Sequence, residues 1–531
     1  MENRKFLLRS VVCFFIIISM FLFCFLRVAV IAMGNYGELC ERQGEYVASV
    51  SLKRGTIYDT NMVPLTNTAK KLIAAISPTK SAFLVIEDLL SGEELERVKK
   101  ELEQGRGTVC EVEKIIHCDG ITYKEIYDVN SRANTALHAV GYIDSKGKGV
   151  SGIESAYNHI LYSSKKVEAV FQLAGDGTVL KGIKPVFKNA SKTVENAVVT
   201  TLDYDIQNAA EEAAAGLQKG AIVICEADSG KIRALVSRPE YNINNIAAAL
   251  DSADAPLVNR TLASFSVGSV FKPCVAAAAL ENGIFDFTHK CTGSTHIIDR
   301  DFKCHYRAGH GLVNINKAIA YSCNTFFYNF AMEIGAEPIY KMASALNFGH
   351  SLNIAKNIKT SAGNLTEISK LSNFAYLANL SIGQGDLSLS PVSLMTLYLA
   401  IAGDGSYYVP SLIEKTIVNG REEKYDIGAK TKAFSKSTAQ ILRSALYGVV
   451  EQGTGVAAKP ERISAAGKTA TAQTGRYNED GREITNSWFC GFFPAHKPKY
   501  VAVILSDGES DVPTTKMFAT FADKMANIGK V

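Results

Sequence analysis

A serine and a lysine stand three residues apart at Ser269 and Lys272, immediately before the apolar stretch 274–280. If this region is helical, the two side chains lie on one face of the helix, one turn apart. A serine hydroxyl becomes a good nucleophile when a neighbouring base takes its proton, and a lysine amine can be that base when burial or another cation lowers its pKa. The same spacing occurs by chance on solvated helix faces, so the pair predicts acyl transfer only together with further motifs.

A second pattern places Ser322 and Asn324 on either side of Cys323, at the start of the apolar stretch 325–328. A hydroxyl and an amide at these positions could relay a proton and hold a substrate amide. The alternative is structural, because serine and asparagine often cap the first turn of a helix.

A third pattern is Lys468-Thr469-Ala470-Thr471, which small residues flank on both sides. On an edge strand, Lys468 could hold a substrate carboxylate while the strand's backbone pairs with an extended peptide. The alternative is an exposed lysine on an ordinary strand. Each pattern is weak alone, but the three follow the order of S-x-x-K, S-D-N and K-T-G, the motif set of β-lactamases and penicillin-binding proteins.

The chain resembles the class B penicillin-binding proteins over nearly everything that follows its apolar N-terminal stretch. Besides the three motifs, the likeness rests on segments that resemble the limits of a pedestal domain, the entry to a transpeptidase domain, glycine-bearing loops near its site and the strand after its third motif: 54–59, 149–157, 201–207, 383–385, 453–455 and 487–492. The implied fold is α/β and multi-domain. It has one N-terminal transmembrane helix, a mixed α+β pedestal, and a transpeptidase domain with a central antiparallel sheet flanked by helices.

The resemblance implies a peptidoglycan D,D-transpeptidase that works through a serine acyl-enzyme. Ser269 would be acylated by the penultimate D-Ala of a stem peptide, and Lys272 would be the base. β-Lactams would acylate the same serine as substrate mimics. Ser322 and Asn324 would shuttle protons and position the donor. No cofactor would be required for this chemistry.

The third motif would bind the donor, with Lys468 and Thr469 holding its carboxylate. The backbone N–H groups of Ser269 and Thr471 would form the oxyanion hole. The family also implies partners: a membrane glycan polymerase and other cell-wall assembly proteins, with a role in cell shape among the functions of such assemblies.

Two positions depart from the family pattern, because the third motif has Ala470 in place of glycine and the second has Cys323 in place of aspartate. A methyl group where a ligand's backbone approaches closely is a steric cost. A catalytically weak or inert penicillin-binding scaffold therefore stays as an alternative. A D,D-carboxypeptidase, which would need a water that deacylates the serine quickly, is a separate alternative. Elongation, division and sporulation roles are all compatible with the sequence.

A candidate metal site lies between the first two motifs, where Cys291, Cys304, His310 and Cys323 are separated by 12, 5 and 12 residues. Three thiolates and an imidazole suit a closed tetrahedral zinc site. Elongation-type members of the family can carry zinc here through carboxylate, histidine and cysteine ligands, so the resemblance supports the location, while this chain offers a softer ligand set. A zinc ion here would have a structural role. A Cys291–Cys304 disulfide and free thiols are the alternatives, and His305 is a weaker candidate ligand.

The N-terminus predicts a membrane anchor, because residues 10–33 are almost wholly apolar and long enough to cross a bilayer as a helix. Three basic residues precede this span, whereas Glu38 and Glu41 follow it. The positive-inside rule therefore predicts a single-pass signal-anchor with residues 1–9 in the cytoplasm and the catalytic domain outside the cell membrane. A cleaved signal peptide is the weaker alternative, since no small-residue cleavage site follows clearly.

The length of 531 residues exceeds what one hydrophobic core supports, so several domains are expected. A change in sequence texture near 195 divides a pedestal, 34–195, from a transpeptidase domain, 196–531. The formal net charge of +4 is too small to indicate nucleic-acid binding.

Overall fold

The computed structural model describes residues 2–33, 44–189, 196–298 and 300–531. Helix α1 (Glu2–Met33) contains one segment, Arg4–Met33, that is long and apolar enough to cross a membrane by its length and composition. It includes the predicted span 10–33. Glu38 and Glu41, which supported the predicted orientation, lie outside the described residues.

The chain forms two compact units. The first comprises Met1–Lys53, Thr68–Ser131 and Ser163–Thr193, and the second comprises Arg54–Asn67, Arg132–Tyr162 and Val194–Val531. Two segments from the predicted pedestal range therefore pack within the same unit as the three motifs. The expected boundary at 195 falls at the last passage from one unit to the other, on residues that the structure does not describe, and the domain limits stay a prediction.

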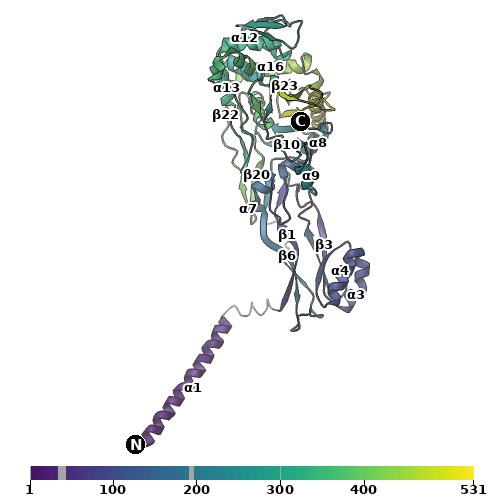
Figure 1. The fold of residues 1–531 in the computed structure, drawn as a ribbon, viewed down its shortest axis with the longest axis vertical. Coiled ribbons are helices and arrows are strands. Elements are labelled where there is room, and N and C mark those ends of the chain that lie inside the picture. The colour runs from purple at the N-terminus through teal and green to yellow at the C-terminus, as the bar shows by residue number, and fades with distance from the viewer. Residues whose placement is uncertain (1, 34–43, 190–195, 299) are drawn as a thin grey trace. The chain divides into compact units, whose positions relative to one another are not determined.

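The first unit is a small α+β assembly. Its three-stranded sheet has the order β4-β3-β5, formed by Thr108–Val112, Lys70–Ile76 and Ile121–Tyr127. Helices α3 (Lys80–Leu89) and α4 (Gly92–Glu103) lie side by side next to β3 (Figure 1) and bury an apolar face with it. A second sheet has the order β1-β6-β7, formed by Glu45–Arg54, Tyr162–Gln172 and Val186–Lys188.

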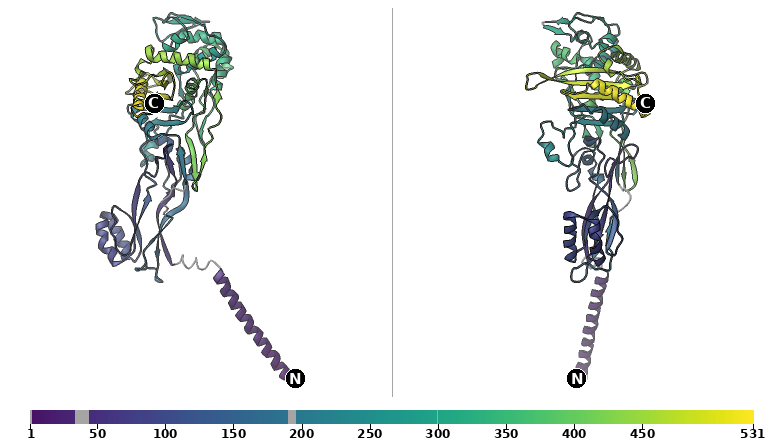
Figure 2. Two further views of the ribbon diagram at one scale, coloured as in Figure 1. Left: turned by 180° about the vertical axis from the view of Figure 1, so that it is seen from behind. Right: turned by 90° about the vertical axis from the view of Figure 1, so that its right-hand side faces the viewer.

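The second unit is built on an antiparallel sheet with the strand order β10-β9-β25-β24-β23. These strands are Ile232–Arg238, Gly220–Glu226, Tyr500–Asp507, Glu483–Phe493 and Ala466–Tyr477. The run Val501–Leu505 is apolar at every position because both faces of the sheet are covered. Helices α8 (Tyr204–Ala213) and α17 (Thr514–Asn527) pack on one face, where Figure 2 shows α17 in yellow against the strands. The predicted central sheet flanked by helices is confirmed.

The opposite face of the sheet carries the helices that bear the first two motifs. The turn η1 (Gly268–Phe271) leads into α10 (Lys272–Glu281), and α11 (Ile315–Ala320) leads into α12 (Asn324–Ile334). Helix α10 is buried at every position from Lys272 to Leu280, so it is a core helix without a solvated face. Helices α15 (Pro391–Ala402) and α16 (Lys436–Gln452) complete this layer.

The remaining elements of the second unit are a separate four-stranded sheet, several shorter helices, hairpins and connections. They are β2 (Thr56–Tyr58), α5 (Leu137–Val140), α6 (Gly152–Ala156), α7 (Asn158–Leu161), β8 (Ala197–Thr200), α9 (Ile246–Leu250), β11 (Phe265–Ser266), β12 (His289–Cys291), β13 (Ser294–Ile297), β14 (Arg300–Lys303), β15 (Gly311–Val313), α13 (Ala336–Ala345), β16 (Asn353–Ala355), β17 (Ile358–Lys359), η2 (Lys370–Ser372), α14 (Phe374–Ser381), β18 (Ser388–Leu389), β19 (Ser406–Tyr407), β20 (Ile413–Val418), β21 (Arg421–Lys424), β22 (Thr431–Lys432) and η3 (Val456–Ala458).

A buried ion network joins two of the segments that carried the family resemblance. Glu154 is almost completely buried and accepts hydrogen bonds from the guanidinium of Arg54, including one of 2.7 Å from Nε. Arg132 lies 3.1 Å from the other carboxylate oxygen of Glu154. The network holds the segments 54–67 and 132–162 together within the second unit.

We expect Glu154→Gln to lower the free energy of unfolding of the second unit by about 3–5 kcal/mol, because it leaves two buried guanidinium groups without their carboxylate. Urea unfolding followed by the fluorescence of Trp488, the only tryptophan, would measure this. The matched control is Glu337→Gln, which breaks the exposed Glu337–Lys341 pair and should leave the free energy of unfolding almost unchanged. Equal effects of the two substitutions would contradict the structural role of the network.

Candidate active site

The turn that presents Ser269 is fixed by two glycines. Gly268 has a φ of +70°, a conformation that glycine adopts at no steric cost, and its N–H donates to the carbonyl oxygen of Gly383 at 2.8 Å. A Cβ atom at Gly383 would lie only 2.0 Å from the carbonyl oxygen of Gly268. Glycine at 383 is therefore required for this close approach, which leaves Ser269 half-buried at the start of η1.

Lys272 points from the first turn of α10 into the second motif. Its side chain is fully buried, and Nζ donates to the carbonyl oxygen of Ser322 at 2.8 Å and to Oδ1 of Asn324 at 2.7 Å. The hydroxyl of Ser322 lies 3.2 Å from the same nitrogen. Ser269 Oγ has no hydrogen-bond partner among the described residues, so its proton is free to be donated.

Burial lowers the pKa of Lys272 from 10.5 to about 7. The ring of Phe327, whose centroid is 5.3 Å from Nζ, favours the charged form through a cation–π contact, but burial outweighs it. A neutral amine has two N–H bonds and one lone pair. The two oxygen atoms of Ser322 and Asn324 satisfy both N–H bonds, which leaves the lone pair to accept a proton from a serine hydroxyl.

The second motif is held in an uncommon backbone conformation. Ser322 has a φ of +55°, in the left-handed region that non-glycine residues rarely adopt, and Cys323 is the N-cap of α12. This geometry turns the Ser322 carbonyl oxygen and the Asn324 side chain toward the same nitrogen. Strain of this kind persists where surrounding contacts hold it, and it is frequent at functional sites.

The third motif lies on β23, the edge strand next to η1 (Gly268–Phe271), which we call the nucleophile turn because it carries Ser269. Lys468 is fully buried and donates to the carbonyl oxygen of Thr469 at 3.0 Å. Its pKa is well below the ordinary value, because of burial and of the charge of Lys272 nearby. A substrate carboxylate would favour the protonated form of Lys468. Thr469 shares a hydrogen bond of 2.7 Å with the hydroxyl of Thr454, and Thr471 is exposed on the strand.

The methyl group of Ala470 lies inside the protein and not on the open side of the strand. Ala470 is 7% exposed, and its Cβ would be 3.3 Å from a Cβ placed on Gly268. The extra methyl group therefore packs toward the backbone beside Ser269. The cost of this methyl group for the efficiency of acylation stays a prediction. The structure adds that the methyl group packs against the turn that carries Ser269.

Two residues that support the nucleophile turn had no strong sequence signal for this role. The indole Nε1 of Trp488 donates to the carbonyl oxygen of Ser266 at 2.9 Å, and the hydroxyl of Tyr398 donates to the carbonyl oxygen of Val270 at 3.0 Å. Tyr398 has the only ring hydroxyl within the apolar helix α15, which is the one sequence feature that could have marked it.

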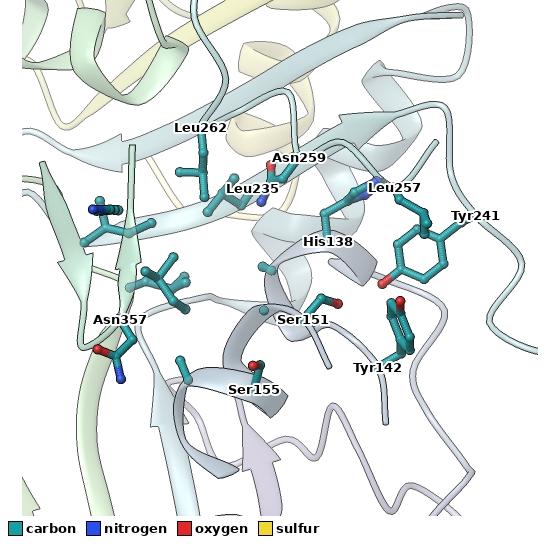
Figure 3. A pocket seen from close by; sticks show the side chains of 17 residues that line it. His138, Tyr142, Ser151, Ser155, Leu235, Tyr241, Leu257, Asn259, Leu262 and Asn357 are labelled. Atoms are coloured by element: carbon teal, nitrogen blue, oxygen red, sulfur yellow. The ribbon is translucent and has the colours of Figure 1, made fainter. Parts of the chain in front are cut away.

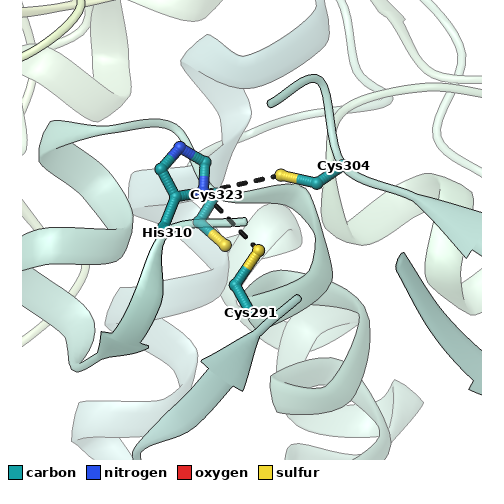
Figure 4. Close-up of side chains that lie close together, drawn as sticks. All are labelled: Cys291, Cys304, His310 and Cys323. Carbon is teal, nitrogen blue, oxygen red and sulfur yellow. Dashed lines mark hydrogen bonds between the residues drawn. The ribbon is translucent and has the colours of Figure 1, made fainter. Parts of the chain in front are cut away.

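The four predicted metal ligands come together beside the second motif. One ligand atom from each of Cys291, Cys304, His310 and Cys323 lies within 4.8 Å of the other three (Figure 4). His310 Nδ1 is 3.6 Å from the sulfur of Cys291 and 3.7 Å from that of Cys304. The edges of a tetrahedron around zinc, with its usual bond lengths, are about 3.6–3.8 Å, so the donor set fits this metal.

The thiols of this cluster are free in the structure, and their environment favours a thiolate at one position. A hydrogen bond from the Cys323 thiol, with others from His305 and backbone N–H groups, lowers the pKa of Cys304 against the opposing effect of burial. The same interaction raises the pKa of Cys323. His305 contacts Cys304 but does not belong to the group of four.

These features define a serine acyl-transferase: a hydroxyl at a helix start, a buried amine one turn away, and an edge strand with a second buried lysine. The family model described as the penicillin binding protein transpeptidase domain matches residues 220–524. The chain belongs to this family, and its likeness to relatives over most of its length makes it a class B penicillin-binding protein. The predicted family, fold class and class of enzyme, a transpeptidase, are confirmed.

Relatives and solved structures agree with this assignment. The peptidoglycan D,D-transpeptidase MrdA of Acinetobacter baumannii is 27% identical, over 86% of this chain and 77% of that protein. The D,D-transpeptidase domain of a peptidoglycan glycosyltransferase from Eggerthella lenta is 25% identical, with a TM-score of 0.65 over 91% of this chain and 100% of that one. Penicillin-binding protein PBP2 of Helicobacter pylori, solved in a complex with MreC, is 21% identical and has the same fold, with a TM-score of 0.65 over 92% and 100%.

We expect the rate of acylation by a fluorescent penicillin to rise as the pH increases through about 7, the pKa of Lys272. Only the unprotonated amine can take the proton of Ser269, so the rate should fall about tenfold for each pH unit below this value. Lys272→Arg should abolish this rise, because a guanidinium stays protonated across the range. A wild-type rate that is constant between pH 6 and 9 would contradict the role of Lys272 as the base.

Proposed function

We propose that this chain forms peptide cross-links in peptidoglycan as a D,D-transpeptidase with Ser269 as its nucleophile. The observation that carries the proposal is the fully buried amine of Lys272, which is hydrogen-bonded to the second motif one helical turn from Ser269. The names of the relatives support the choice of substrate, since MrdA of A. baumannii is a peptidoglycan D,D-transpeptidase.

In the proposed reaction, Ser269 Oγ attacks the carbonyl carbon of the penultimate D-Ala while Lys272 takes the hydroxyl proton. The bond to the terminal D-Ala then breaks, and the leaving amine receives a proton through Ser322. Lys468 and Thr469 bind the terminal carboxylate, and the N–H groups of Ser269 and Thr471 hold the oxyanion. An amine of a neighbouring stem peptide then attacks the acyl carbon, the ester bond to Ser269 Oγ breaks, and the proton lost by the amine returns to Ser269 Oγ through Lys272, which completes the cross-link. A β-lactam follows the first step and stays on Ser269.

The proposed setting is the outer side of the cell membrane. Arg4, Lys5 and Arg9 before the apolar segment support a cytoplasmic N-terminus and an extracytoplasmic catalytic unit. The complex of H. pylori PBP2 with MreC supports a place in a cell-wall assembly. We infer that the partners include such a protein and a membrane glycan polymerase.

Ser269→Ala should abolish covalent labelling by a fluorescent penicillin and the formation of cross-linked products from a stem-peptide donor. Ser264→Ala, five residues upstream, is the matched control and should retain both activities. Labelling of the Ser269→Ala variant would overturn the nucleophile assignment. Labelling of the wild type with release of the donor by water alone would favour a D,D-carboxypeptidase, and labelling with no turnover of donor would favour an inert scaffold.

We also propose that Cys291, Cys304, His310 and Cys323 hold one structural zinc ion. The convergence of the four donors and the match of the sulfur–nitrogen distances to a tetrahedral site support it. A bound zinc would cross-link the segment 291–323 and fix Cys323 between the two catalytic residues of the second motif. The transpeptidase chemistry itself needs no metal in this proposal.

Metal analysis of the purified chain should find about one equivalent of zinc, and Cys304→Ser should lower zinc retention during dialysis against a chelator by at least about tenfold. Cys225→Ser, at a buried thiol outside the cluster, should leave zinc retention unchanged. Less than about a tenth of an equivalent in the wild type would rule out a stoichiometric site.

A further inference from the structure

The second unit contains a cavity that none of the three motifs lines. It has a volume of about 440 Å³ and lies between three parts of the unit: the segment 138–156, the strand and loop 235–262, and the hairpin formed by β16 and β17 (Figure 3). This volume is in the range of pockets that bind small molecules. All three parts belong to the same compact unit.

The cavity is separate from the catalytic cleft. Leu235, in its wall, belongs to β10, whereas the third motif is on β23 at the opposite edge of the five-stranded sheet. Four inter-strand spacings of about 4.8 Å separate these edges, which is roughly 19 Å. A ligand in this cavity would therefore not occupy the position of the acyl donor.

The floor of the cavity is apolar, and one wall is aromatic. The floor consists of aliphatic side chains: Leu235, Leu257, Leu262, Ile354, Ile358 and Leu412. The wall is formed by His138, Tyr241 and Tyr142, whose rings meet edge to face at centroid distances of 5.1 Å and 5.7 Å. Such contacts fix the rings in place, and an apolar or planar group could pack against them.

Several polar groups around the cavity have unused hydrogen-bonding capacity. The hydroxyl of Tyr142 has no hydrogen-bond partner within the described part of the chain. Asn259 accepts two hydrogen bonds from Thr261 through Oδ1, which leaves its amide nitrogen available to donate. By contrast, the hydroxyl proton of Tyr241 is already used, because it is donated to the carbonyl oxygen of Leu137 at 2.9 Å.

The charge of the cavity is set by one cation. Lys359 lines it, and no carboxylate pairs with this lysine among the residues that the structure describes. Burial lowers the pKa of His138 and so favours its neutral form, and its Nε2 lies 2.7 Å from the carbonyl oxygen of Pro256. Among the lining residues that the structure describes, none is an aspartate or a glutamate. An anion therefore meets attraction from Lys359 and no carboxylate in the lining.

We propose that this cavity binds a small amphipathic organic anion, with its apolar or aromatic body on the aliphatic floor and its acid group at Lys359. The apolar floor and aromatic wall favour the body, and the Tyr142 hydroxyl and Asn259 amide give directional contacts to polar substituents. The unpaired lysine selects a carboxylate or another acid over a neutral analogue.

The probe for this site is 4-benzoylbenzoate, a photoreactive aryl carboxylate, applied to the full chain in detergent micelles. After irradiation, peptide mapping by mass spectrometry should find the label on peptides from 138–156 or 354–359. Lys359→Gln should lower this labelling about threefold, as expected for the loss of one partly exposed ion pair. Ser155→Phe, which places a large ring at an exposed position of the lining, should nearly abolish it.

Lys356→Gln is the matched control, since Lys356 is exposed on the same hairpin but does not line the cavity. It should label as the wild type does, and neutral benzophenone should label the wild type and Lys359→Gln equally. Acylation of Ser269 by a fluorescent penicillin verifies that each variant is folded. Equal carboxylate labelling of the Lys359 and Lys356 variants, or labelling confined to other peptides, would overturn the proposal.

Discussion

The burial of the Lys272 amine without a carboxylate partner among the described residues is the constraint on which the catalytic site depends. The lowering of its pKa from 10.5 to about 7 corresponds to roughly 5 kcal/mol of preference for the neutral amine. Between these pH values the amine of Lys272 is protonated in the unfolded chain but not in the folded chain. Lys272 therefore lowers the free energy of unfolding near neutral pH, and this effect disappears as the pH rises toward 10.5. The fold maintains a base at the expense of stability.

The rest of the second unit supplies what this constraint requires. Helix α10 is buried along almost its whole length, so the helix that carries Lys272 cannot turn it toward water. The left-handed Ser322 and the N-terminal residue of α12 provide two oxygen acceptors for the amine. On the other side, β23 brings a second buried lysine, whose like charge also disfavours protonation of both groups together. Nucleophile turn, second motif and edge strand thus form one electrostatic unit.

Much of this site could be predicted from residue types and short spacings. The serine and lysine one turn apart, the lysine and threonine of the third motif and the four metal-ligand candidates all follow from local patterns. Ser322, Lys468 and Gly383 lie far from Ser269 in the sequence, and their contacts depend on strand order and helix packing, which local patterns do not encode. The same reason explains why segments 54–67 and 132–162 could not be assigned to the second unit, because a buried ion network of Arg54, Glu154 and Arg132 decides their place.

A titration of Lys272 itself would show whether its amine is unprotonated at neutral pH, as a base must be. In a chain labelled with ¹³C at the lysine ε-carbons, the resonance that disappears in Lys272→Arg would be assigned to this residue and followed by NMR from pH 5 to 11. We expect a midpoint near 7, about three units below that of an exposed lysine. A midpoint near 10.5 would show that the amine is protonated at neutral pH, and the assignment of Lys272 as the base would be wrong.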